Sequence, residues 1–242
     1  MSGGGTGLLV TRRNAVVTIA LNHPERANAL DPDEFHDLAA RLAAEAGAQG
    51  TLAVVLTGQG ERAFCAGLNL GDRAAIQEDL ASAGTTGLGA VLRAAAGLGV
   101  PLIGRINGAC VAGGMGLLGA CDVAIAVDTA RFGLPEIRHG IVPHVALAGL
   151  HGRGATAVVR RLADTGVMID AAAALEAKLI DAIFPAAGLD EAIAAQIDAI
   201  RSGRMPARFA ERRAAGTASV MQRIDRAEAR GKADQNSQQL TV

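Results

Sequence analysis

Aromatic side chains are scarce in this sequence, which has no tryptophan, no tyrosine and five phenylalanines. Half of the 242 residues are nonetheless hydrophobic. That content is enough for a sizeable core, in one domain with a helical extension or in two small domains. We therefore expect a core of closely packed small side chains with few bulky ones.

The sequence also lacks an excess of charge of either sign. Its formal net charge is −1, and 19% of its residues are charged. Such a balance gives no general attraction to nucleic acid, so we expect no nucleic-acid partner. Lys178 and Lys232 are the only lysines, and arginine supplies the remaining positive charge.

Disulfides, metal sites and membrane segments are not indicated either. Cys65, Cys110 and Cys121 are odd in number, and their spacing fits neither a disulfide framework nor a zinc site. The glycine-rich N-terminus lacks the apolar core of a signal peptide. The apolar run at 111–126 is broken by glycines, contains Asp122 and is too short to span a bilayer. We expect a cytoplasmic protein with no bound metal and no membrane partner.

Strand-like and helix-like segments alternate along the chain, which predicts an α/β fold. Apolar β-rich runs predict strands at 8–10, 15–21, 52–57, 102–106 and 123–127. A helix is expected to begin at 31–34, where an aspartate N-cap, a proline and a glutamate come together. Further helices are expected at 156–163, 171–177, 189–200 and 206–230. The polar tail from Gly231 is expected to be frayed.

Common catalytic signatures are missing: there is no Gly-x-Ser-x-Gly elbow, no Walker loop and no His-Glu-x-x-His. The letters at 114–119, GMGLLG, match Gly-x-Gly-x-x-Gly. A dinucleotide site needs that motif directly after the first strand of a βαβ unit, whereas here it lies in the middle of the chain. The simpler interpretation is that these glycines let a helix pack closely.

Two glycine-containing turns are more informative, at 63–70 and 106–114. Each could direct a backbone N–H to one point, the second at a helix N-terminus, where the helix dipole favours negative charge. Two such donors on one oxygen form an oxyanion hole. Spacing alone does not determine whether the two turns converge.

Five segments in order make the chain resemble the enoyl-CoA hydratase/isomerase, or crotonase, superfamily over about residues 10–185. They are LNHPERANAL at 21–30, FCAGLNL at 64–70, the NG to CD segment at 107–122, FGLPE at 132–136 and GIVP at 140–143. The resemblance implies a spiral of stacked ββα turns, with an acyl-CoA-binding core at 1–190. It also implies a C-terminal helical region at 191–242 that covers the active site and builds a homotrimer or hexamer.

By the same resemblance, the N–H groups of Leu68 and Gly113 form the oxyanion hole. Coenzyme A is part of the substrate, and no other cofactor is expected. The residues expected to bind the CoA moiety or thioester are Arg26, Ala27, Ala66, Leu68, Asn69, Leu70, Gly71 and Gly113. Asn69 stands where the family usually has an aspartate, which removes a charge beside this loop.

The carboxylates are expected to determine the reaction. Family hydratases use two glutamates, and the position of the first is Gly116 in this chain. The second is present as Glu136, and family isomerases can work with this one alone. The resemblance therefore favours isomerase-like chemistry on an enoyl-CoA with Glu136 as acid/base. Without the resemblance, Glu136 could equally be a surface glutamate after a proline turn.

His144 replaces a small residue at the expected active-site wall. It could be a second acid/base, since imidazole titrates near neutrality, or it could fill the pocket or cap a helix. His139 and His151 are weaker candidates. An acyl-CoA-binding protein of the same fold that has lost turnover is the alternative function, favoured by Gly116 and His144 and opposed by Glu136.

Overall fold

The computed structural model describes residues 7–71, 73–81 and 84–239. Most of the glycine-rich N-terminus (1–6) and the last part of the tail that was expected to fray (240–242) lie outside the described residues.

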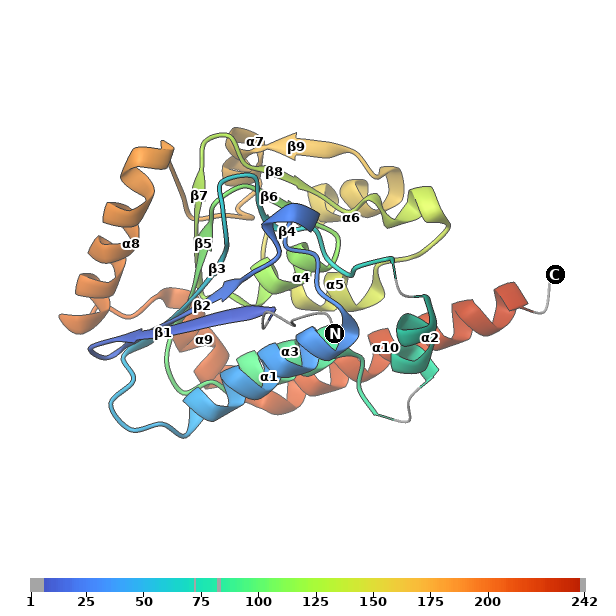
Figure 1. Ribbon diagram of the computed structural model, residues 1–242, viewed down its shortest axis with the longest axis horizontal. Coiled ribbons are helices and arrows are strands. Elements are labelled where there is room, and N and C mark those ends of the chain that lie inside the picture. The colour runs from blue at the N-terminus through green and yellow to red at the C-terminus, as the bar shows by residue number, and fades with distance from the viewer. Residues whose placement is uncertain (1–6, 72, 82–83, 240–242) are drawn as a thin grey trace, which may run out of the picture.

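Two sheets form the centre of the molecule (Figure 1). The larger has the order β1 (Leu8–Arg13), β2 (Val16–Leu21), β3 (Ala53–Gly58), β5 (Leu102–Ile106), β7 (Val123–Val127) and β10 (Ala182–Phe184). The smaller has the order β4 (Ala63–Cys65), β6 (Ala109–Val111), β8 (Arg131–Gly133) and β9 (Met168–Asp170). Neighbouring strands run parallel, except that β1–β2 and β8–β9 are antiparallel.

The predicted strands of the larger sheet are confirmed. β1 and β2 form the expected hairpin, which turns at Asn14 with φ of 53°. Every residue of β3 and β7 is buried. Parallel strands covered on both faces favour continuous apolar runs, and such runs identified these two strands in the sequence.

The chain passes from the larger sheet to the smaller sheet three times. β3 continues into β4 and then α2 (Arg73–Ala81) and α3 (Gly87–Gly97); β5 continues into β6 and α4 (Gly113–Ala120). β7 continues into β8, the 3₁₀ helix η2 (Pro135–His139) and α5 (His144–Gly149). This succession is the expected spiral of ββα turns. The short strands of the smaller sheet were not predicted, because three residues give too little pattern to identify.

Most of the predicted helices are also present. α1 (Pro32–Ala46) begins at the expected signal, and the Glu34 carboxylate accepts the Asp31 N–H at 2.8 Å. α6 (Thr156–Thr165), α7 (Ala171–Glu176) and α8 (Ala186–Arg201) lie where helices were expected. The boundary expected at 190/191 falls inside α8, which lies to one side of the larger sheet (Figure 1).

The C-terminal helices correct two expectations. The single helix predicted over 206–230 is wrong, because α9 (Ala207–Ala215) and α10 (Thr217–Gln239) are separated at Gly216, whose φ is 68°. The prediction of a frayed tail from Gly231 is also wrong as far as Gln239, because α10 continues to that residue. A tertiary contact holds the additional part of the helix, since a carboxylate oxygen of Asp234 lies 2.7 Å from Nε2 of His144. Earlier in α10, the buried Glu228 carboxylate accepts the Thr86 N–H at 2.7 Å and pairs with Arg93 at 2.8 Å.

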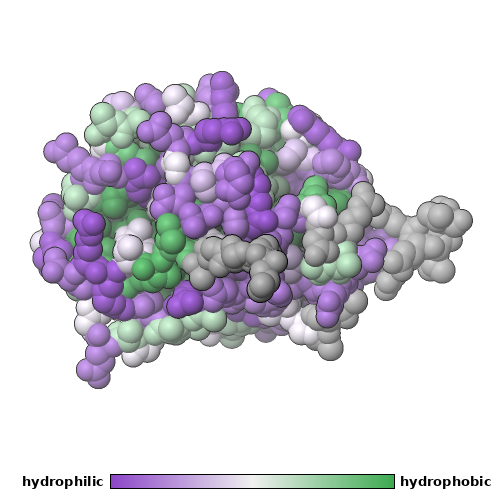
Figure 2. Space-filling view, in the orientation of Figure 1, coloured by the Kyte–Doolittle hydropathy of each residue, from purple (hydrophilic) through white to green (hydrophobic). Residues whose placement is uncertain are grey.

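The core of the described residues contains many leucine and isoleucine side chains beside alanine, so the expectation of mainly small side chains holds only for the scarcity of aromatic residues. Phe35, Phe64 and Phe132 are its buried aromatic residues within the described ranges. Hydrophilic side chains cover most of the face in Figure 2, with an apolar patch over β1, where Leu9 and Val10 are exposed. None of the helices in the described part of the chain has the length and apolar character needed to cross a membrane.

Arg212 fastens α9 to the C-terminal end of α3. Its guanidinium donates to both oxygens of the buried Asp122, at 3.0 and 2.8 Å. It also donates to backbone carbonyls at and just beyond the C-terminal end of α3, where intrahelical donors become scarce. These are the carbonyls of Ala95, Ala96, Leu98 and Val100. One side chain thus satisfies a helix terminus and a buried carboxylate together.

Replacing Arg212 by methionine is expected to lower the free energy of unfolding by about 3–5 kcal/mol, since it leaves Asp122 buried without its ion-pair partner. Urea denaturation followed by circular dichroism measures this change. Arg213→Met, at the neighbouring exposed position, is the control and should stay within about 0.5 kcal/mol of the parent. Equal stability of the two variants would contradict the anchoring role of Arg212.

Candidate functional site

Three segments with predicted site residues begin at the same edge of the smaller sheet, where β4, β6 and β8 end. β4, β6 and β8 are parallel neighbours, with Cys65 paired to Cys110 and Val111 paired to Gly133. Because the carboxyl ends of parallel strands meet at the same edge of a sheet, the segments 66–71, 112–114 and 134–136 emerge side by side. Ligands of α/β proteins bind preferentially at such an edge.

The first two segments are in direct backbone contact. Gly67 has φ of +90°, and a β-carbon at this position would lie 2.7 Å from the Gly113 nitrogen. A β-carbon on Gly114 would collide with the carbonyl oxygen of Cys65. Only glycine permits both approaches. The two turns therefore converge, which the sequence left open.

Two backbone donors lie where these turns meet. Leu68 is next to Gly67, and Gly113 is the first residue of α4. No group in the described ranges accepts a hydrogen bond from either N–H. The Gly113 N–H also lies at the positive end of the helix dipole.

Ala112, which precedes this donor, has φ of 52° and ψ of −122°. Side-chain-bearing residues rarely adopt this backbone conformation, which costs about 1–3 kcal/mol. The chain therefore holds the approach to α4 in a strained geometry.

Two buried asparagines fix the strand that leads into the first turn. The side-chain amides of Asn28 and Asn107 both donate to the carbonyl of Ala63, at 2.8 and 3.1 Å. Asn107 also accepts the Gly58 N–H at 3.0 Å. Both belong to motifs that carried the resemblance, but only the structure shows that they hold the same carbonyl.

The loop expected to bind CoA is hydrogen-bonded to the segment before α1. The Ala66 N–H donates to the Ala27 carbonyl at 3.0 Å, and the Asn69 N–H donates to the Leu30 carbonyl at 2.8 Å. The structure thus brings together Ala27 and residues 66–69. Leu70 is exposed at the end of the loop, and the Gly71 N–H donates to the Asn69 side chain at 3.2 Å.

Arg26 is held by carboxylates at the start of α1. Its guanidinium donates to Asp31 at 3.0 Å and to Glu34 at 2.6 Å. Asp31 also accepts the Asn69 side-chain amide at 2.8 Å. The sequence analysis interpreted Asp31 and Glu34 only as a helix start. Arg26 lies 5 and 8 positions from them, but Asn69 joins the network from 38 positions away, and only the fold brings it there.

Glu136 lies in η2, directly after β8. One of its carboxylate oxygens, Oε2, is buried without a hydrogen-bond partner in the described part of the chain. Burial raises the pKa of Glu136 from 4.5 to about 7. A carboxyl group with such a pKa can exchange protons near neutral pH.

Gly116 lies inside a tight contact between helices. A β-carbon there would lie 3.1 Å from Leu88 of α3 and 3.2 Å from the Cα of Ala146 in α5. Even a β-carbon at Gly116 would therefore need these neighbours to shift by a few tenths of an ångström.

His144, the first residue of α5, is joined to the C-terminal helix. Its Nε2 lies 2.7 Å from a carboxylate oxygen of Asp234 in α10. The side chain is partly buried, with 18% of its surface exposed. His144 thus contributes to holding α10 against the core, a contact with no signal in the sequence.

Comparisons with known proteins agree with this architecture. The family model for enoyl-CoA hydratase/isomerase matches residues 11–239. A carnitinyl-CoA dehydratase structure from Mycobacterium avium is 28% identical, with a TM-score of 0.78 over 96% of this chain and 91% of that one.

Two curated relatives are similar in sequence. The chain is 34% identical over 184 residues to an (E)-benzylidenesuccinyl-CoA hydratase of Thauera aromatica, covering 73% of this chain and 70% of that protein. It is 35% identical over 155 residues to the putative enoyl-CoA hydratase/isomerase YngF of Bacillus subtilis. That second match covers 62% of this chain and only 60% of the relative.

Gly67→Ala is expected to lower the free energy of unfolding by about 2–4 kcal/mol, because the new methyl group meets the Gly113 nitrogen and the backbone conformation disfavours a side chain. Urea denaturation measures the loss. Gly47→Ala is a matched control, since its β-carbon would meet nothing within 4 Å and its φ is −102°. Comparable stability of both variants would show that the turns can separate without cost.

Proposed function

The chain belongs to the enoyl-CoA hydratase/isomerase family, and on that basis we propose that it binds an enoyl-CoA thioester and isomerises its double bond. The observation that carries this proposal is the convergence of the Leu68 and Gly113 turns at the edge from which Glu136 also emerges. A pair of backbone N–H groups can donate hydrogen bonds to the thioester oxygen. A carboxylate of raised pKa can transfer a proton to or from the neighbouring carbon atoms.

The proposed reaction needs one base. The ionised carboxylate of Glu136 removes a proton from C2 of a 3-enoyl-CoA, and the electron pair moves to the thioester oxygen to give a dienolate. The N–H groups of Leu68 and Gly113 donate to that oxygen, each worth about 3 kcal/mol in comparable sites. The same carboxyl group then returns the proton to C4, which yields the 2-enoyl-CoA.

Isomerisation is favoured over hydration by the surroundings of Gly116. Hydration in the family uses a second glutamate to orient water, and at Gly116 even the β-carbon of such a side chain would lie only 3.1 Å from Leu88 and 3.2 Å from Ala146. We assign binding of the CoA moiety to Arg26, Ala27 and residues 66–71. We also propose that the chain assembles as a homotrimer or hexamer, as its family resemblance implies.

Acyl-CoA binding without turnover is the second candidate function. The closed packing at Gly116 favours it, and so does the pairing of His144 with Asp234. The unpartnered oxygen of Glu136 favours catalysis instead. The two candidates share ligand binding and differ only in product formation, so one pair of assays separates them.

Glu136→Gln is expected to reduce isomerisation of 3-enoyl-CoA by at least ~10²-fold, because the amide cannot accept a proton at neutral pH. Acyl-CoA binding, measured by calorimetry, should remain, since the amide has nearly the same shape. Glu191→Gln, at an exposed position on α8, is the control. Unchanged turnover in the Glu136 variant would exclude it as the base. Binding without turnover in the parent would establish the second candidate function.

The pH profile of kcat/KM for isomerisation should rise through about pH 7. The pKa of Glu136 is raised to about 7 by burial, so its carboxyl group is protonated, and inactive as a base, below that pH. Initial rates between about pH 5.5 and 8.5 test this expectation. Acyl-CoA affinity over the same range provides the comparison. A flat rate profile with constant affinity would rule out the assigned role.

A further inference from the structure

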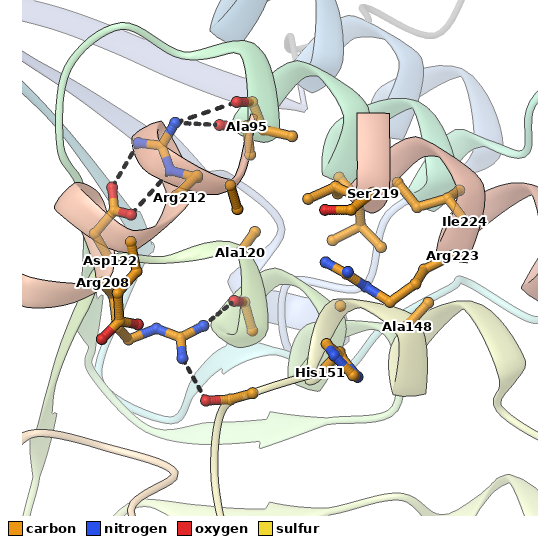
Figure 3. Close-up of a pocket in the computed structure, with 18 of the residues that line it drawn as sticks. Ala95, Ala120, Asp122, Ala148, His151, Arg208, Arg212, Ser219, Arg223 and Ile224 are labelled. Carbon is orange, nitrogen blue, oxygen red and sulfur yellow. Dashed lines mark hydrogen bonds and ion pairs between the residues drawn. The ribbon is translucent and has the colours of Figure 1, made fainter. Parts of the chain in front are cut away.

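A cavity of about 300 Å³ lies between the C-terminal helices and the core (Figure 3). α9 and α10 form one side, and the C-terminal ends of α3 and α4 form the other. Its volume is at the lower end of the range for small-molecule pockets. The proposed catalytic site is at the opposite end of α4, which is eight residues long and spans about 12 Å.

The polar side of this cavity carries unbalanced positive charge. Asp122 lines it but is already paired with Arg212. Arg223 extends from α10 into the cavity (Figure 3), and within the described ranges no side chain or carbonyl accepts a hydrogen bond from it. Its Nε is buried without a partner, as is the Nε of Arg208. The remaining acid of the lining, Glu211, is exposed.

A buried guanidinium nitrogen without an acceptor is costly, because its hydration is lost without replacement. His151 lies beside the same charge, and its pKa is lowered by burial and then by Arg223. A bound anion would supply the missing acceptor.

The rest of the lining is mostly apolar, with Leu92 of α3 and Val220 and Ile224 of α10 beside several alanines. A site with guanidinium groups on one side and apolar walls selects an amphipathic anion over a fully hydrated one. We propose that this cavity binds a short-chain carboxylate, with its carboxylate on Arg223 and its alkyl chain along Leu92, Val220 and Ile224. Carboxylate pairs with guanidinium through charge-assisted, often bidentate, hydrogen bonds.

Calorimetry of the full chain with acetate, butyrate, hexanoate, hexanol and inorganic phosphate tests the proposal. Hexanoate should bind saturably and more tightly than acetate, and hexanol should bind at least tenfold more weakly. Arg223→Gln should weaken hexanoate binding at least tenfold, while Arg226→Gln, exposed on the same helix, should not. Binding of acyl-CoA should be the same in parent and both variants, which separates this site from the proposed catalytic one.

Three results would overturn the inference: no saturable carboxylate binding by the folded parent, equal binding by Arg223→Gln, or equal binding of hexanol. If phosphate binds, and acetate, butyrate and hexanoate bind with equal affinity, the cavity is a simple anion site and the carboxylate assignment is wrong. If Arg223→Gln does not fold, ¹⁵N NMR of arginine Nε groups in the parent decides. Hexanoate should shift the Arg223 signal and leave that of Arg226 unchanged.

Discussion

The backbone of Gly67 lies against the backbone of Gly113 with no side chain between them, and the geometry of the site depends on that contact. It joins the carboxyl end of β4 to the start of α4. A β-carbon at Gly67 or Gly114 would separate the two segments. Two further features support this contact. The strained backbone at Ala112 directs the chain from β6 into α4, and the hydrogen bonds from Asn28 and Asn107 to the Ala63 carbonyl hold β4 in place.

Charged side chains set the position of the C-terminal helices on this core. Glu228 accepts the N–H and hydroxyl of Thr86 at the start of α3, and Arg212 donates to carbonyls at the end of the same helix. Both ends of α3 are thus capped by residues more than 110 positions away along the chain. α9 and α10 also form one side of the cavity that contains Arg223. The contacts that hold these helices on the core therefore also form that cavity.

Glu136 and Gly116 show how local packing shapes the candidate site. Burial raises the pKa of Glu136 to about 7 and makes proton exchange near neutrality possible. At Gly116, three helices meet so closely that a β-carbon would lie 3.1 Å from Leu88 and 3.2 Å from the Cα of Ala146. The proposal of a one-base reaction rests on the side chains at these two positions and on the spacing of the helices around them.

The sequence by itself determined the long elements and the family, since β3, β7 and the start of α1 carry continuous apolar runs or capping residues that act locally. It also identified Leu68, Gly113 and Glu136 as candidates through ordered motifs. It could not reveal the convergence of the two turns, the contact of Asn69 with Asp31 or the His144–Asp234 pair, and it wrongly ended the last helix early. These features depend on contacts between residues distant in sequence, and local preference carries no information about which distant groups will meet.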